Sequence, residues 1–273
     1  MDKVPIPEHD VTALEALGRG IAGLRIYIVN AFAISRPSGE WMLIDTGLPH
    51  SHNRIRKWVE ELFAGTRPRG ILLTHGHSDH SGSVEKLATF WDVPVYVHPL
   101  ELPYVTGRAK YLPPDPTVGG GMMSLLSPFL PRDPVNLGNR AQVLPSDGTV
   151  PGFPEWRWIH TPGHTPGHIA LFREADRILI AGDALSTTRQ ESLMAVATQR
   201  PELHGPPAYM TTDWDQARAS VEKLATLRPR LIAAGHGRPL AGLDVAGALS
   251  VLAKDFDRVA RPEHGRYVNR PAA

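Results

Sequence analysis

A dense group of metal-binding residue types stands at residues 72–83, LLTHGHSDHSGS, directly after an apolar run. On an extended backbone, side chains two residues apart point to the same side, so His75 and His77 can bind one cation. Asp79 and His80 lie on the following turn and can face a neighbouring position. Neutral imidazoles and carboxylates favour zinc, manganese or iron(II) over calcium or magnesium.

Three further apolar runs end in the same way, with a glycine followed at once by histidine or aspartate. These endings place His164, Asp183 and His236 directly after Gly163, Gly182 and Gly235. Glycine permits tight turns and the close backbone approach that a small ion needs. Side chains from separate strand ends can converge on one rim of a layered fold, so we expect the four endings to form one site.

Together the four endings predict two neighbouring metal sites. We expect His164 to complete a three-histidine set on the first ion, and His236 to join the second. The two oxygens of Asp183 can bridge both ions, which leaves room for a shared hydroxide and gives the open coordination of a catalytic site. The predicted ligands are His75, His77, Asp79, His80, His164, Asp183 and His236.

Composition narrows the function classes. The chain has 273 residues, 42% of them hydrophobic and 21% charged, which suits one large globular domain. It has no cysteine, so thiolate metal sites and disulfides are excluded. Lys and Arg number 29 against 28 Asp and Glu, without a basic block, so we expect no nucleic-acid partner. Because no signal core or membrane-length apolar run is present, we expect a cytoplasmic protein with no membrane partner.

Short apolar runs alternate with amphipathic segments, which predicts an α/β layered sandwich in a single domain over residues 1–273. An irregular apolar insertion at about 103–140 interrupts it. Helices are expected at 52–63, at 83–91 with Ser83 as N-cap, at 214–226, and at 243–260 with Asp244 as N-cap. Strands are expected at 24–34, 40–47, 70–75, 93–98, 141–144, 155–160, 168–173, 177–181 and 230–235.

The segments THGHSDH, TPGHT, AGDA and AGHG resemble the signature of the metallo-β-lactamase superfamily, H-x-H-x-D-H followed by His, Asp and His. The resemblance covers roughly residues 24–240. It implies the four-layer αββα sandwich with a binuclear site along its edge. It also implies that Asp45, in IDTG, is the carboxylate that orients a ligand imidazole. Since seven ligands already fill two ions, His168 is expected to be a buried histidine bonded to Asp45 or to a backbone carbonyl rather than a ligand.

The resemblance implies a binuclear metal-dependent hydrolase that uses a metal-bridging hydroxide to cleave a small carbonyl ester, with a lactone or thioester favoured. Two divalent ions lower the pKa of a shared water, so that hydroxide is available for attack near neutral pH. Asp79 can protonate the leaving group. Zinc is the favoured metal, with manganese or iron as alternatives. Other readings are a mononuclear iron persulfide dioxygenase of the same fold, a β-lactam or phosphodiester hydrolase, and a non-enzymatic metal-binding domain.

Departures from known branches of the superfamily bear on the substrate. β-Lactamases with a cysteine ligand are excluded, glyoxalase II has a longer C-terminal region, and lactonases carry a tyrosine where Ser186 stands. The segment 122–130 is expected to form either a lid over an acyl or aromatic group or the interface of a homodimer. Six histidines outside every motif are expected to be solvated or structural: His9, His50, His52, His98, His204 and His264. The candidate pocket residues are Ser186, Thr188, Gln190, Met122, Met123, Phe129 and Tyr209.

Overall fold

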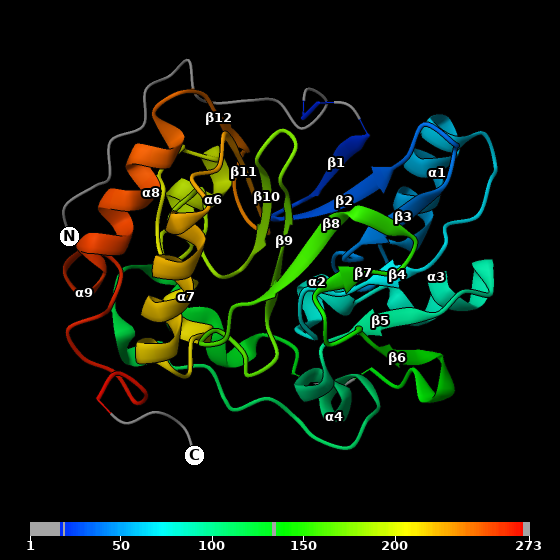
Figure 1. Cartoon of the computed structure of the whole chain (residues 1–273). Coiled ribbons are helices and arrows are strands. Elements are labelled where there is room, and N and C mark those ends of the chain that lie inside the picture. The colour runs from blue at the N-terminus through cyan, green and yellow to red at the C-terminus, as the bar shows by residue number, and fades with distance from the viewer. Residues whose placement is uncertain (1–16, 19, 133–134, 270–273) are drawn as a thin grey trace. The chain divides into compact units, whose positions relative to one another are not determined.

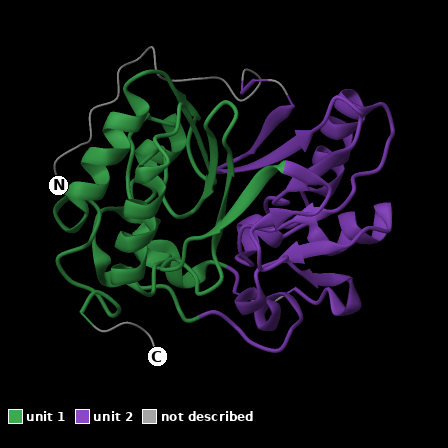
Figure 2. Cartoon of the chain, viewed as in Figure 1, with its two compact units in different colours: residues 1–13, 112–130, 155–273 green, residues 14–111, 131–154 purple. Residues whose placement is uncertain are grey.

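The structure is a computed structural model that describes residues 17–18, 20–132 and 135–269. Its contacts divide the chain into two compact units, coloured in Figure 2. Unit 1 holds the described residues within 112–130 and 155–273, and unit 2 holds those within 14–111 and 131–154. The two units alternate along the sequence, because residues 112–130 belong to unit 1 and separate the two segments of unit 2.

Unit 2 is built on a six-stranded sheet whose order follows the sequence, β1 to β6 (Figure 1). The first three strands pair antiparallel and the last three join in parallel. Helices α1 (His52–Phe63) and α3 (Val84–Trp91) contribute Ile55, Val59 and Leu87 to the apolar core of this unit. The strands are β1 (Ile21–Ile26), β2 (Val29–Ser35), β3 (Trp41–Ile44), β4 (Ile71–Leu72), β5 (Val95–Val97) and β6 (Ala141–Val143).

Unit 1 contains most of a second six-stranded sheet, in the order β12-β11-β10-β9-β8-β7. Strands β10 and β11 are parallel, and the other strand pairings recorded for this sheet are antiparallel. Helices α7 (Trp214–Thr226), α8 (Val245–Lys254) and α9 (Phe256–Val259) share its apolar core. The strands are β7 (Thr149–Val150), β8 (Phe153–His160), β9 (Ile169–Arg173), β10 (Ile178–Gly182), β11 (Leu231–Ala234) and β12 (Leu240–Ala241).

Several sequence expectations need correction. The strand expected at 24–34 is a hairpin, because the chain turns at residues 27–28, where Tyr27 has a φ of 56°. The helix expected at 243–260 is divided at Asp255 into α8 and α9. Neither predicted N-cap side chain forms a capping hydrogen bond. The Ser83 hydroxyl instead donates to the Leu48 carbonyl, at 2.9 Å, and accepts from the Ser51 amide.

The described part of the 103–140 region contains short helical turns between irregular segments. It contains α4 (Leu102–Val105), α5 (Met122–Leu126) and three 3-10 turns, Pro116–Val118, Ser127–Phe129 and Gly138–Arg140. Further short elements that sequence periodicity did not indicate are α2 (Ser78–Ser81), α6 (Leu193–Thr198), β7 and β12. Over the described part of the chain, no helix has the length and apolarity needed to cross a membrane.

Candidate metal centre

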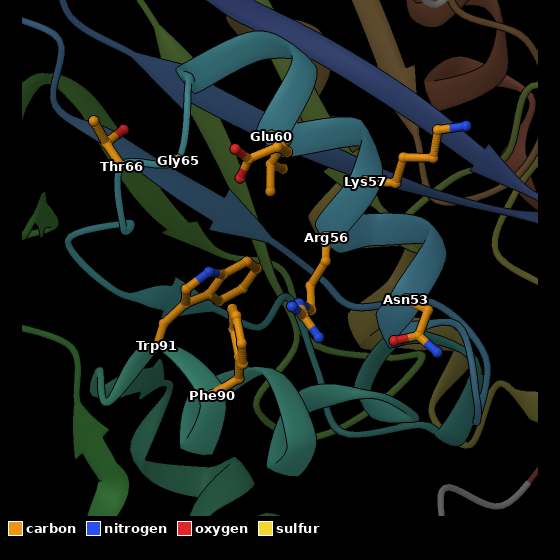
Figure 3. A pocket seen from close by; sticks show the side chains of 9 residues that line it. Asn53, Arg56, Lys57, Glu60, Gly65, Thr66, Phe90 and Trp91 are labelled. Carbon is orange, nitrogen blue, oxygen red and sulfur yellow. The ribbon is translucent and has the colours of Figure 1, made fainter.

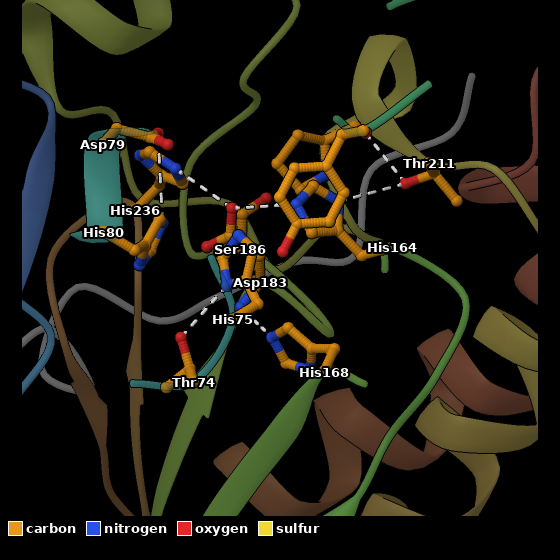
Figure 4. Close-up of polar contacts among 12 residues, drawn as sticks. Thr74, His75, Asp79, His80, His164, His168, Asp183, Ser186, Thr211 and His236 are labelled. Carbon is orange, nitrogen blue, oxygen red and sulfur yellow. Dashed lines mark hydrogen bonds and ion pairs between the residues drawn. The ribbon is translucent and has the colours of Figure 1, made fainter. Parts of the chain in front are cut away.

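The first cluster of predicted ligands lies in unit 2, on the loop that follows β4 and on the single turn α2. His75 and His80 are fully buried. The ring centroid of His75 lies 4.7 Å from that of His77 and 4.3 Å from that of His80. Asp79 Oδ2 lies 3.9 Å from His80 Nε2. Figure 4 draws both side chains. Four predicted ligands of one unit therefore lie close to one another.

Asp45, which directly follows β3, supports this cluster through contacts to Thr74 and His80. Its Oδ1 accepts the Thr74 amide proton and its Oδ2 accepts the Thr74 hydroxyl proton, both at 2.8 Å. The same Oδ2 lies 2.8 Å from His80 Nδ1, so His80 presents Nε2 on its opposite edge. Asp45 has a φ of 58°, a left-handed conformation that aspartate tolerates better than most residues. The structure thus brings Asp45 to the imidazole of a predicted ligand.

The second cluster lies in unit 1 and consists of His164, Asp183 and His236. They come from the loop after β8 and from the carboxyl ends of the parallel strands β10 and β11. Asp183 Oδ2 lies 3.6 Å from His164 Nε2 and 3.2 Å from His236 Nε2, the contacts drawn as dashed lines in Figure 4. One carboxylate oxygen therefore faces two imidazole nitrogens within this unit.

Backbone pairing explains why these three residues meet. The Gly235 amide donates to the Gly182 carbonyl at 2.8 Å, so the residues that follow the two glycines leave neighbouring strands at the same edge. Gly163, before His164, has a φ of 130°, and a Cβ there would lie 2.4 Å from the Ala217 nitrogen at the start of α7. Only glycine permits both that backbone conformation and that approach.

His168 supports the second cluster and is not placed as a ligand. Its Nε2 accepts the Asp183 amide proton at 2.8 Å, and its Nδ1 lies 2.8 Å from the Thr161 hydroxyl. Both ring nitrogens are engaged by the protein, which leaves neither for a metal. His168 is fully buried, and its ring contacts a backbone amide and a hydroxyl, whereas Asp45 or a backbone carbonyl was the expected partner.

The donors in both clusters fit divalent transition metals. Every predicted ligand offers nitrogen or oxygen, and a buried carboxylate that orients an imidazole, as Asp45 does with His80, is typical of metal-bound histidine. In the second cluster one Asp183 carboxylate oxygen faces two imidazole nitrogens. The two clusters therefore suit bound divalent metals, and their chemistry does not select one metal.

The polar pocket candidates after Asp183 differ in what their side chains contact. The Ser186 hydroxyl donates to the Gly205 carbonyl at 3.1 Å, and the Thr188 hydroxyl donates to the Ala195 carbonyl at 3.2 Å. Gln190 is 1% exposed, yet neither atom of its amide has a hydrogen-bond partner among the described residues. Since a buried amide without partners is costly, Gln190 is the strongest polar candidate for a ligand contact.

Three of the apolar pocket candidates lie on α5 and the turn that follows it, and Tyr209 lies on the 3-10 turn Ala208–Met210, also in unit 1. Met122 is 51% exposed and Phe129 is 83% exposed, whereas Met123 packs against the apolar core and Tyr209 is buried in it. The Met123 amide donates to the Glu191 carbonyl at 3.1 Å, which attaches α5 to the segment that follows Asp183. Whether residues 122–130 form a lid or an interface stays a prediction.

The expectation that His204 is solvated or structural can be compared with its surroundings. It pairs with Ser186 in an antiparallel bridge, and it is 6% exposed. In the described part of the chain neither ring nitrogen of His204 has a hydrogen-bond partner, so a solvated role is excluded. No spacing rule points to it, because its relation to Ser186 depends on strand pairing.

A cavity elsewhere in unit 2 is separate from the predicted site. It has a volume of about 420 Å³ and lies between α1 and α3, with the Arg56 guanidinium 3.5 Å from the Phe90 ring centre (Figure 3). None of its lining residues is a predicted ligand or pocket residue. The lining consists of Asn53, Arg56, Lys57, Val59, Glu60, Gly65, Thr66, Phe90 and Trp91.

Comparison with protein families matches most of the chain to one superfamily. The family described as "Metallo-beta-lactamase superfamily" matches residues 24–236, a span that contains all seven predicted ligands. The chain belongs to this superfamily. Its relatives include "Probable metallo-hydrolase YflN" of Bacillus subtilis (strain 168), 45% identical over 244 residues that cover 88% of this chain and 92% of YflN. "Probable metallo-hydrolase YybB" of the same organism is 26% identical over 198 residues, covering 72% of this chain and 76% of YybB.

Solved structures of the superfamily share the fold. BLEG-1, a B3 metallo-beta-lactamase, matches with a TM-score of 0.61 at 20% identity, over 88% of this chain and 97% of its own. TTHA1623, solved in a di-iron-bound form, matches with a TM-score of 0.55 at 24% identity and the same coverage. These likenesses confirm the predicted α/β fold class of the metallo-β-lactamase type, and membership places the chain among the metal-dependent hydrolases.

Proposed function

We propose that this superfamily member is a binuclear metal-dependent hydrolase that cleaves a small carbonyl ester, with a lactone or thioester favoured. The observation that carries the proposal is the Asp183 carboxylate, whose Oδ2 faces the Nε2 atoms of both His164 and His236. In the proposal His75, His77 and His164 hold one ion, and Asp79, His80 and His236 hold the other. Asp183 would be the ligand common to both.

The remaining roles follow from the contacts of each side chain. When bound, two divalent ions supply an acidic water as nucleophile and polarise the carbonyl oxygen of the substrate. Asp45 keeps the His80 imidazole in one orientation through Nδ1. Asp79 is only partly buried, with its carboxylate 3.9 Å from His80, so it can carry a proton to the leaving group. We propose zinc as the metal, with manganese or iron as alternatives.

Two features of unit 1 support a substrate with a polar head and an apolar part. The buried Gln190 amide offers one donor and one acceptor that no described residue uses. The exposed side chains of Met122 and Phe129 lie on the segment that the Met123 amide ties to Glu191, next to Gln190. An acyl chain or aromatic group on the substrate suits this surface.

The test combines metal analysis with a substrate panel. Purified protein, loaded with zinc or manganese, is assayed on acyl-homoserine lactones, aryl esters, thioesters, a β-lactam and a phosphodiester. We expect two ions per chain and turnover of at least one lactone, ester or thioester. No carbonyl-ester turnover by protein that holds two ions would count against the proposal. A single iron with thiol-dependent oxygen uptake would instead indicate a persulfide dioxygenase.

A further inference from the structure

A buried carboxylate from the segment after β5 reaches the loop that carries the first two predicted ligands. Glu101, fully buried at the end of the turn Pro99–Glu101, accepts the Gly76 amide proton on Oε2 at 2.9 Å. Gly76 stands between His75 and His77. Glu101 therefore holds the peptide that joins His75 to Gly76, one of the two peptides that separate these imidazoles.

Tyr111 completes the contact. Its hydroxyl accepts the same Gly76 amide proton at 2.9 Å and donates to Glu101 Oε2. Burial, followed by the nearby Glu101 charge, raises the pKa of Tyr111 well above its ordinary value, so the hydroxyl keeps the proton it donates. The Tyr111 ring lies 4.3 Å from the His77 ring, centroid to centroid, and stacks on Tyr104 at 4.0 Å.

The carbonyl of Gly76 also has a protein partner. The Ser81 hydroxyl donates to the Gly76 carbonyl at 2.9 Å, so both polar groups of this residue have protein partners. A Cβ at position 76 would lie 2.7 Å from the Tyr111 hydroxyl oxygen and 3.0 Å from Val105 Cγ1. Glycine is needed here for close approach, because any larger residue would push Tyr111 away.

We propose that Glu101 and Tyr111 are positioning residues that hold the Gly76 peptide and so preorient His75 and His77 for a metal ion. Preorientation of ligands lowers the entropy lost on binding, so it raises metal affinity without adding a ligand. The inference rests on the proposed function only in taking these two histidines as ligands. It assigns a role to the 101–111 segment, which the ligand signature does not include.

The test is a cobalt(II) titration of the full chain, followed by visible absorption, which reports affinity and ligand geometry without catalysis. Y111F removes the hydroxyl but keeps the ring against His77 and Tyr104. We expect its affinity for the tighter cobalt site to fall by about 10- to 100-fold, with a changed spectrum. Y104F removes a hydroxyl from the stacked neighbour, which does not contact Gly76, and should stay within about twofold of wild type.

A second variant separates positioning from folding. E101Q keeps an acceptor for the Gly76 amide and loses only the charge, so we expect an affinity between those of wild type and Y111F. Circular dichroism confirms that each variant is folded before titration. Equal cobalt affinities and spectra for Y111F, Y104F and wild type would overturn the positioning role. Failure of wild type itself to bind cobalt would instead contradict the proposed function.

Discussion

The cluster of unit 2 and the cluster of unit 1 use the same side-chain types but are assembled differently. His75, His77, Asp79 and His80 are almost consecutive and lie on one loop and one helical turn. His164 comes from the loop after β8, and Asp183 and His236 meet because β10 and β11 are parallel neighbours. The first cluster depends on local conformation, and the second depends on sheet topology.

The contacts that hold the two clusters in place also differ. In unit 2 they are side chains: Asp45 contacts His80, and Glu101 contacts the Gly76 amide. In unit 1 much of the support comes from the backbone. The Gly235 amide donates to Gly182, and the Asp183 amide donates to His168. A locally assembled cluster thus needs distant carboxylates to set its geometry, whereas strand pairing already sets the geometry of the dispersed one.

The largest effect is expected from Asp183→Ala, which removes the carboxylate that faces both imidazoles of unit 1. The rate of hydrolysis should fall by more than about 100-fold, a larger effect than loss of a supporting residue has. Steady-state kinetics and metal content measure it. Asp215→Ala, at an exposed ion pair with Arg261 in the same unit, is the matched control and should retain activity. Full activity in D183A would remove the basis for a shared ligand.

A smaller loss is expected from Asp45→Asn in unit 2. The amide keeps the shape but weakens the contact to His80 Nδ1, so metal affinity should fall by about 10- to 100-fold. Competition with a metal chelator measures this change. Asp92→Asn, at the exposed end of α3, is the control. If both variants bind metal equally, the Asp45 side chain does not set the geometry of the cluster in unit 2.

The smallest of the three losses is expected from His168→Phe in unit 1. It breaks the contact to the Asp183 amide, but the pairing of β10 with β11 remains. Metal affinity should fall by no more than about tenfold, the lower end for supporting residues. The same chelator competition applies. A loss larger than that of D45N would reverse the comparison, since unit 1 would then depend more on a side chain than on its backbone.

Regular periodicity made part of the fold predictable. The helical spacing of apolar residues located α1 and α7 with their observed ends, 52–63 and 214–226. The hairpin of β1 and β2 was missed because its turn has no glycine and Tyr27 adopts a left-handed conformation that tyrosine rarely takes. Strands of two residues, such as β7 and β12, are too short to show a period.

The sequence by itself determined the metal-binding residue types, their spacing at 75–80 and the glycine that precedes each remaining ligand. The tertiary structure alone decided that His168 bonds the Asp183 amide, that Gln190 and His204 are buried without described partners, and that Glu101 and Tyr111 hold Gly76. The physical reason is the distance along the chain over which each signal acts. Spacing along a chain reports only the local backbone, whereas a hydrogen-bond partner tens of residues away depends on which strands pair and how the chain returns.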